Sequence, residues 1–482
     1  MKSLFSIILL CCLSFLARAK NIYVSNADDA NKYLKQANAG DTVLLKAGIY
    51  TDAVIKFINK NGTAQQPIVF TAEHEGKVFF EGNSTLNFSG NYIVVKDFVW
   101  RNGGHGLKTK QVIEFRTSEN EFANNCTVQD CVIDTYNNDD KNIVNTWVGL
   151  YGERNLLTRC LLKAKDNRGP TVVVWLKNGV PAHHTISYNY FLTRRNGPDA
   201  DNGLESLRIG DSKTSLTDAG CVTAFNRFED CDGEIEIISN KSCHNSYLHN
   251  TFINSDGGLT LRHGNNCLCD GNFFDGGTKP LSYGIRIIGE GHYVSNNYFY
   301  NLHGATNQSF RAPLTIVNGI VNTPVNGYFQ VRRAIVSDNV FVNCATPDIR
   351  IGVFSKRDNM TQAPDTLTIQ RNLIFDDAGK AGNVYEEMSE PHHTNYTENK
   401  VAGAYLKASA KGFANITNVN LKRNGFESIK DEKGNVLASV NNTVEIKTTA
   451  GADKVSSSII KAMENKRYSY LQVNEVGPNW MR

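Results

Sequence analysis

Short runs that alternate apolar with polar residues recur along most of the chain. In most repeats such a run follows an asparagine that has an aromatic or aliphatic residue two positions after it. Three of the six spacings between successive copies of this motif lie between 22 and 25 residues, a period typical of stacked repeats. The motif starts at Asn189, Asn226, Asn250, Asn272, Asn297, Asn339 and Asn372.

The alternating runs predict short strands with one buried and one exposed face, as in residues 234–238, 258–262, 284–288 and 313–317. Short strands, turn-rich joints and a coil of about two dozen residues predict an all-β fold, a right-handed parallel β-helix with inserted loops. We expect the asparagines to hydrogen-bond from coil to coil and the following aromatic residues to stack inside. A β-sandwich or a propeller is the alternative, although a propeller blade needs about 40 residues.

The repeat indicates approximately where the β-helical domain begins and ends. We assign residues 20–400 to the β-helix, with a looser repeat from Ile22 to about Cys160. Residues 26–37 are predicted to form a short amphipathic helix that caps the open core. The repeat fades after about Lys380, and residues 401–482 are expected to continue the β-helix or pack on it.

The first nineteen residues have the features of a secretory signal peptide. Lys2 is followed by an apolar run from Leu4 to Leu16 and then by Ala17-Arg18-Ala19, with small residues where cleavage after Ala19 requires them. The run is too short to span a membrane. We therefore expect a secreted or periplasmic protein without a transmembrane segment. Lipid attachment at Cys11 or Cys12 is the less favoured alternative.

The charge and the cysteine content of the chain limit the classes of function and of fold that the sequence allows. The chain has 51 Lys and Arg against 48 Asp and Glu, which is not the basic excess that nucleic-acid binding needs. Nine cysteines follow residue 19, and this odd number argues against a disulfide framework. An anionic partner would therefore have to be bound by local groups of Lys and Arg.

One such group follows from stacking the predicted strands. Glu234 and Glu236 are expected to leave one face of a strand, with Asn202 and Glu205 on the preceding coil. Carboxylate and amide oxygens are ligands that suit calcium, and like charges this close are costly without a cation. A solvated strand face with ordinary Glu–Lys pairs is the alternative, and for an isolated Glu-x-Glu motif it is the better one.

Basic residues on the same and the following coils add to this strip, which is expected to face solvent. Lys241 lies on the coil of Glu236, Arg262 and His263 lie on the next one, and Arg286 on the one after that. Positive neighbours favour the neutral amine that a lysine base requires. Together the residues indicate a base, an acid and a clamp for an anionic substrate.

These blocks resemble polysaccharide lyase family 6, which contains alginate lyases and chondroitinase B. The similarity rests on Asn202…Glu205…Arg208, on the Glu234-Ile-Glu236…Lys241-Ser block and on Arg262-His263-Gly264, followed by Arg286. It implies that Ca²⁺ binds Asn202, Glu234 and Glu236, with Glu205 as a fourth ligand. It further implies that Lys241 is the base, that Arg262 is the acid, and that His263, Arg208, Arg286 and Tyr151 contact sugar.

The resemblance also implies the reaction. A lyase of this family removes the C5 proton of a uronate and breaks the bond at C4 by β-elimination, leaving an unsaturated end. Glu205, three residues after Asn202, resembles the alginate-cleaving members, which makes alginate the expected substrate. A chondroitinase B-like dermatan sulfate lyase, a glycoside hydrolase and a β-helical glycan-binding protein without catalysis are the alternatives.

Overall fold

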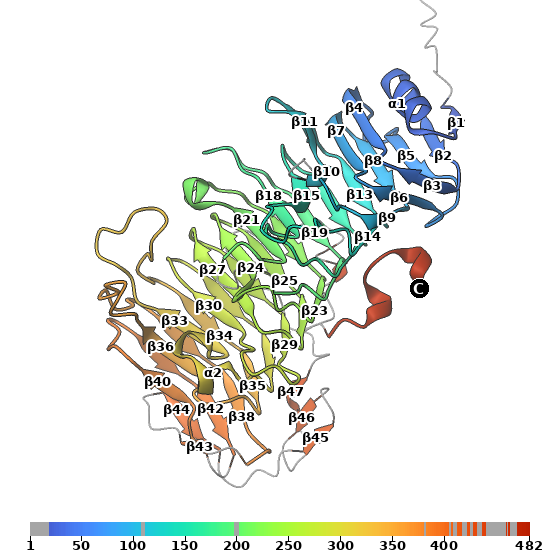
Figure 1. Ribbon diagram of the computed structural model, residues 1–482. Helices are drawn as coiled ribbons and strands as arrows, with labels where there is room; N and C mark the ends of the chain where they lie inside the picture. The colour runs from blue at the N-terminus through green and yellow to red at the C-terminus, as the bar shows by residue number, and fades with distance from the viewer. Residues whose placement is uncertain are drawn as a thin grey trace, which may run out of the picture.

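The computed structural model describes residues 19–107, 111–196, 202–379, 382–403 and 470–482, with shorter stretches between 406 and 462. Its coils stack along one axis, from α1 (Ala27–Gln36) and β1 (Asn21–Val24) at one end to β40 (Tyr385–Glu387) and β42 (Asn399–Ala402) at the other (Figure 1). The predicted signal peptide lies almost entirely outside the described residues. No helix among the described residues is long and apolar enough to cross a membrane.

Three long sheets, almost entirely parallel, run the length of this stack, each receiving about one strand per coil. Sheet I consists of β1, β2 (Thr42–Leu45), β5 (Ile68–Ala72), β8 (Ile93–Lys96), β13 (Thr127–Gln129), β16 (Leu156–Thr158), β19 (Thr185–Ser187), β22 (Val222–Ala224), β25 (Ser246–Leu248), β28 (Leu268–Asp270), β31 (Tyr293–Ser295), β34 (Ile335–Ser337), β37 (Thr368–Gln370) and β41 (Asn395–Thr397). Sheet II consists of β3 (Gly48–Thr51), β6 (Val78–Gly82), β9 (Phe98–Gly103), β14 (Val132–Asp134), β17 (Leu161–Lys163), β20 (Tyr190–Leu192), β23 (Arg227–Glu229), β26 (Thr251–Ile253), β29 (Phe273–Asp275), β32 (Tyr298–Tyr300), β35 (Val340–Val342), β38 (Leu373–Phe375), β42 and β44 (Phe413–Asn415). Sheet III consists of β4 (Val54–Asn61), β7 (Thr85–Asn91), β10 (Gln111–Glu114), β11 (Arg116–Ser118), β12 (Glu121–Asn124), β15 (Thr146–Leu150), β18 (Val172–Val174), β21 (Leu207–Gly210), β24 (Glu236–Lys241), β27 (Gly258–His263), β30 (Ile285–Ile287), β33 (Leu314–Val317), β36 (Ile349–Val353) and β40.

The remaining elements are short. They are α2 (Gly304–Asn307), the 3₁₀ turns η1 (Ser212–Thr214), η2 (Ser309–Arg311), η4 (Val473–Glu475) and η5 (Asn479–Met481), the pair β39 (Gly382–Asn383) and β43 (Leu406–Lys407), and the antiparallel strands β45 (Lys422–Asn424), β46 (Ser428–Lys430) and β47 (Val436–Ser439). The predicted parallel β-helix is therefore confirmed. Its strands in sheet II continue beyond residue 400, to Asn415.

The predicted asparagine ladder is present at the corner between sheets I and II. Each side-chain amide donates to the side-chain oxygen of the asparagine in the next coil, at 2.9–3.0 Å, from Asn189 through Asn372. The ladder ends on Asn399, one coil further than the sequence motif reached. Because the asparagines are buried, these bonds satisfy polar groups that water cannot reach.

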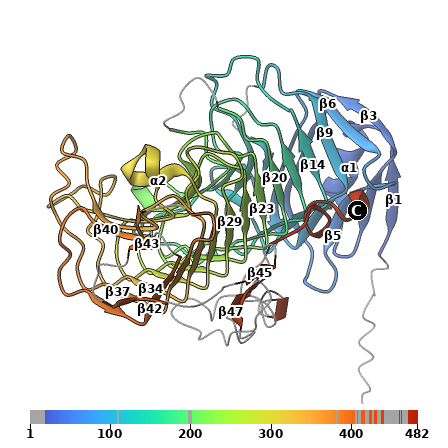
Figure 2. The ribbon, with the colours of Figure 1, turned by 90° about the horizontal axis from the view of Figure 1, so that it is seen from below.

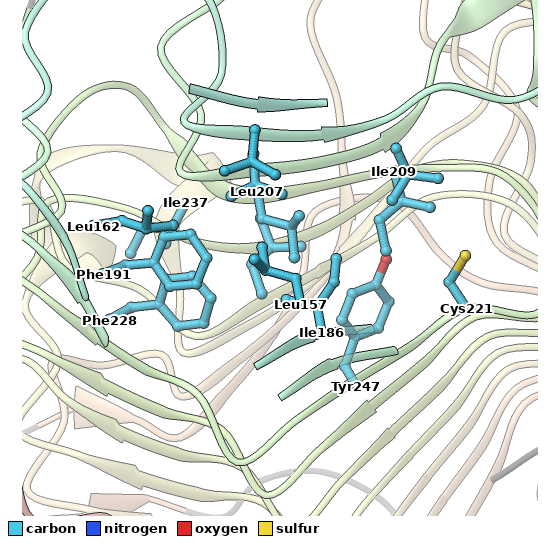
Figure 3. Close-up of a cluster of buried hydrophobic side chains, with 14 of the residues drawn as sticks. Leu157, Leu162, Ile186, Phe191, Leu207, Ile209, Cys221, Phe228, Ile237 and Tyr247 are labelled. Carbon is cyan, nitrogen blue, oxygen red and sulfur yellow. The ribbon is translucent and has the colours of Figure 1, made fainter. Parts of the chain in front are cut away.

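The aromatic residues of the motif stack inside the coils. Ring centroids from Phe191 through Phe228, Phe252, Phe274 and Phe299 to Phe341 are 4.5–5.1 Å apart, with planes within 18° of parallel. Figure 3 shows Phe191 and Phe228 beside aliphatic side chains from all three sheets. The core is thus a column that each coil extends by one layer.

The N-terminal end of this column is closed by α1. The Asn26 side chain caps the helix by accepting a hydrogen bond from the Asp29 backbone amide at 2.7 Å, and Ala30 and Leu34 are fully buried against the first coils. This helix matches the amphipathic segment predicted for residues 26–37.

The C-terminal residues 470–482, here called the strap, fold back along the outside of sheet II. The Arg227 guanidinium donates to Leu471 O at 2.6 Å, and the Trp480 indole donates to Asp130 O at 3.0 Å, so the strap crosses several coils. The segment is red in Figures 1 and 2 and runs toward the N-terminal coils. Leu471 and Val476 of the strap belong to an apolar cluster that also contains residues of sheet II, such as Tyr190, and of sheet I, such as Val222.

We expect Trp480→Ala to lower the free energy of unfolding by about 1–3 kcal/mol, because the half-buried ring packs against Gly76 and its N–H bond is lost. Urea unfolding followed by circular dichroism measures the change. Met481→Ala is the control, since that neighbouring side chain is 54% exposed. Equal midpoints for the two variants would show that the strap does not stabilise the coils.

Candidate active site

Four neighbouring strands of sheet III, β21, β24, β27 and β30, carry most of the predicted site residues. The pairing places Gly210 opposite Lys241 and Lys241 opposite His263. A cleft of about 590 Å³ lies above these strands. Seven of the ten predicted residues line it, namely Asn202, Glu234, Glu236, Lys241, Arg262, His263 and Arg286.

The strip is less exposed than the sequence indicated. His263 is 2% exposed, Arg286 5%, Glu234 6% and Glu236 7%, so the expectation of a solvent-facing strip was wrong for these four side chains. The loop between β33 and β34 accounts for part of this burial. Asn326 and Tyr328 of that loop line the cleft with these residues.

Arg262 is held by this loop. Its guanidinium lies over the Tyr328 ring, 4.2 Å from the centroid, and donates to Gly327 O at 2.9 Å and to Asn326 O at 3.3 Å. Stacking and carbonyl acceptors together fix the direction of the cation. Tyr328 was not predicted from the sequence, because the residue lies in a loop that carries no repeat.

Glu236 and Arg286 form a buried ion pair, with 2.6 Å between Oε1 and NH2. The second Glu236 oxygen accepts a short hydrogen bond from the Ser239 hydroxyl. Glu236 and Ile238 are separated by a register shift, so the strand does not simply alternate as the sequence indicated. In this arrangement Arg286 binds a protein carboxylate.

Glu205 and Glu234 are two buried carboxylates at the cleft, of which Glu234 lines it and Glu205 lies next to Lys241. Glu205 is 1% exposed, and neither carboxylate oxygen has a hydrogen-bond partner among the described residues. Its nearest cations are Lys241 Nζ at 3.8 Å and Arg208 NH1 at 3.9 Å. Burial, and then the neighbouring carboxylates of Glu205 and Glu236, raise the pKa of Glu234 well above its usual range.

Carboxylate and amide oxygens therefore lie close together in and beside the cleft. Asn202 and the buried Glu234 line the cleft, and the buried Glu205 carboxylate lies 3.8 Å from Lys241, which also lines it. Among the described residues, no three His, Cys, Asp or Glu side chains are close enough to hold a metal ion by themselves. The donor chemistry fits a hard cation such as calcium, with Glu236 shared with Arg286.

His263 is neutral at ordinary pH. Burial, together with the charges of Arg262 and Lys241, lowers the pKa of His263 to about 3. Its Nε2 lies 3.5 Å from the Ser212 hydroxyl, and its Nδ1 lies 3.4 Å from Arg262 NH1. A neutral imidazole can donate one hydrogen bond and accept another, but it is not a cationic acid here.

Arg208 lies at the edge of the cleft, whereas Tyr151 lies outside it. Arg208 contacts Glu205 on one side and the Trp175 ring on the other, 5.2 Å from the centroid. Tyr151 lines a neighbouring groove with Trp175 and Phe122. Tyr151 follows β15, which lies three strands away from β24 in sheet III, so it is separate from the seven residues that line the cleft.

The fold and the cleft define a class: parallel β-helix proteins with a charged cleft on one sheet. Comparisons with known proteins narrow this class. The sequence model of the chondroitinase B family matches residues 24–454. No curated protein sequence matches the chain.

Solved structures that are similar to this chain also belong to polysaccharide lyase family 6 by their descriptions. A polysaccharide lyase family 6 alginate lyase, AlyGC, has a TM-score of 0.78 at 29% identity over 96% of this chain and 59% of that chain. A family 6 lyase from Pseudopedobacter saltans has a TM-score of 0.70 at 26% identity, covering 95% of this chain and 99% of that chain. A mannuronic acid specific family 6 lyase from human gut microbiota has a TM-score of 0.73 at 24% identity, covering 95% and 96%. The chain belongs to the chondroitinase B family, polysaccharide lyase family 6.

We expect Arg286→Ala to lower the free energy of unfolding by about 3 kcal/mol, because it leaves the Glu236 carboxylate buried without its counter-charge. Denaturant unfolding measures the loss. The double variant Glu236→Gln/Arg286→Gln buries no charge and should recover more than half of it. An unchanged unfolding midpoint in Arg286→Ala would contradict the assigned pair.

Proposed function

We propose that the protein is a secreted polysaccharide lyase that cleaves alginate by calcium-assisted β-elimination. The observation that carries the proposal is the meeting of Lys241, the buried Glu234 carboxylate and the fixed Arg262 guanidinium in one cleft, with the buried Glu205 carboxylate 3.8 Å from Lys241. Family membership supports the reaction class. Two similar structures are described as an alginate lyase and a mannuronic acid specific lyase, which supports the substrate.

Lys241 is the proposed base. Lys241 is the last residue of β24 and lies at the cleft, and its side chain is 16% exposed. Its Nζ atom lies 3.8 Å from Glu205 Oε1. In the proposed step, its neutral amine takes the C5 proton of a uronate. The electrons of the C5–H bond form the C4–C5 double bond, and the C4–O4 bond breaks. A proton from Arg262 or from water then neutralises the departing O4.

Calcium is proposed to bind Asn202, Glu205 and Glu234, with Glu236 as a further ligand. When bound, the ion would neutralise the uronate carboxylate and stabilise the negative charge that develops next to it. Calcium takes 6–8 oxygen ligands, so oxygens of the substrate and of water would complete the set. Burial first, and then repulsion from Glu205 and Glu236, raises the pKa of Glu234, and the cation would offset the repulsion.

The other side chains have supporting roles in this proposal. Neutral His263 hydrogen-bonds the sugar at the cleft floor, and Arg262 places a fixed positive charge beside the leaving oxygen. Arg208 binds a uronate carboxylate at the edge of the cleft. Arg is a weak proton donor, since its ordinary pKa exceeds about 12. The charge-stabilising role of Arg262 is therefore the main one.

Dermatan sulfate is the second candidate substrate, favoured by the chondroitinase B description of the family model. Alginate and dermatan sulfate are each incubated alone with the protein. The polymer that gives a rise in the ultraviolet absorbance of the unsaturated product is the substrate. Binding of either polymer without a rise in absorbance would indicate a glycan-binding protein instead of an enzyme.

Lys241→Ala should lower kcat on alginate by about 10²–10⁴-fold with little change in substrate affinity, because a base acts mainly in the transition state. Initial rates of ultraviolet absorbance give both parameters. Lys163→Ala, in sheet II and paired with Asp134, is the control and should keep full activity. A turnover near that of the parent in Lys241→Ala would end the proposed mechanism.

Removal of divalent cations should abolish most of the activity, and added calcium should restore it. Isothermal titration of the chelated protein with calcium gives an independent measurement. Glu205→Gln should weaken calcium binding at least tenfold, since it removes a buried carboxylate charge from the proposed site. Full activity of a preparation shown to be free of metal would refute the role of calcium.

A further inference from the structure

A shift in the strand pairing lies directly beside the proposed base. Asn240 of β24 pairs with Leu261 of β27. The next residue of β24, Lys241, pairs with His263. Arg262 is therefore the extra residue of a β-bulge, a feature that locally interrupts the hydrogen bonds between two strands and redirects side chains.

The bulge keeps two positive charges from facing each other directly. Asn240 and Leu261 are fully buried, so the residues that follow them leave the opposite face of sheet III. Without the bulge, Lys241 would pair with Arg262 at about 4.8 Å, and like charges opposite each other destabilise a sheet. With the bulge, Lys241 lies opposite His263, which is uncharged because burial lowers its pKa to about 3.

The Asn240 side chain holds this bulge from inside the core. Its amide donates to His263 O at 2.7 Å and to Ser242 O at 2.9 Å. Its Oδ1 accepts from the Tyr247 hydroxyl at 2.7 Å and from the Asn245 side-chain amide at 2.8 Å. An asparagine side chain has two donor hydrogens and two lone pairs on its oxygen, so these four bonds use its whole capacity.

Two partners of Asn240 connect it to other parts of the β-helix. Tyr247 belongs to β25 of sheet I, and its fully buried ring reaches across the core to sheet III. Figure 3 shows the Tyr247 hydroxyl pointing toward Ile209, the residue that pairs with Asn240. Asn245 accepts a hydrogen bond from the backbone amide of Cys221, on the preceding coil, at 2.9 Å. The network therefore joins sheet I to the segment of sheet III that carries the proposed base.

We propose that Asn240 is a positioning residue that sets the placement of Lys241 relative to Arg262 by stabilising the bulge between them. The inference rests on the proposed function, which assigns these two side chains to the reaction. Asn240 is fully buried and lies outside the lining of the cleft, so it acts through its neighbours and does not contact the substrate. A misplacement of reacting groups by about 1 Å can lower a rate about 10²-fold.

Asn240→Ala should lower kcat on alginate about 10–100-fold and change KM less than about threefold, because the groups of the cleft remain present but are misplaced. Asn250→Ala is the matched control. Asn250 is fully buried on the same coil, and its side chain also makes four hydrogen bonds, but it lies at the corner between sheets I and II. This control should lower the urea midpoint of unfolding by a similar amount and keep kcat.

Tyr247→Phe covers the case that Asn240→Ala does not fold. It removes one hydrogen bond of Asn240 and keeps the buried ring, so kcat should fall about threefold, with KM unchanged. Crystal structures of the wild-type protein and of the variants show the pairing of β24 with β27 independently of any substrate. We expect the pairing of Lys241 to change in Asn240→Ala and to be retained in Asn250→Ala.

The positioning role and the proposed function fail separately. If the wild-type protein releases no unsaturated product from alginate or dermatan sulfate, the proposed function is wrong, and the crystal structures still test whether Asn240 holds the bulge. An Asn240→Ala structure in which Lys241 and Arg262 keep their places would overturn the positioning role. An equal fall of kcat in Asn250→Ala would overturn it too, as would an unchanged kcat in both Asn240→Ala and Tyr247→Phe.

Discussion

Coil-to-coil pairing is the constraint on which the rest of this structure depends. Each coil must align with the next so that all three sheets continue, and a slip of one residue would turn every side chain to the opposite face. The asparagine ladder lies where this alignment is hardest to hold. The residue before each ladder asparagine has a left-handed backbone, with φ between 52° and 67°. For residues other than glycine this conformation costs about 1–2 kcal/mol, which the buried amide bonds help to offset.

The same alignment concentrates charge on sheet III. Strands about 4.8 Å apart bring acids and bases from four coils into one cleft, where burial strengthens both attraction and repulsion. The ion pair between Glu236 and Arg286 neutralises one negative and one positive charge of this cleft within the protein. Among the residues that the structure describes, Glu205 and Glu234 have no ion pair as close as this one, which is the physical basis for proposing a cation.

A stack of coils also has to protect its ends and its outer faces. The helix α1 covers the first coils, which would otherwise expose apolar side chains at the end of the column. The strap covers apolar side chains on the outside of sheet II and connects coils that are far apart in the stack. Such long-range contacts are valuable in a repeat fold, where each coil otherwise touches only its neighbours.

The sequence by itself determined the fold and most of the site. The period of the asparagine motif predicted the β-helix because each coil must repeat the same corner, and the order of Asn202, Glu234, Lys241 and Arg262 was sufficient to place them in one cleft. Only the tertiary structure decided which charges pair and how deeply they are buried. The Glu236–Arg286 pair joins two coils next to a register shift, and the position of Arg262 depends on its contacts with a loop. These features come from residues far apart in the chain, and the local alternation of apolar and polar positions carries no record of them.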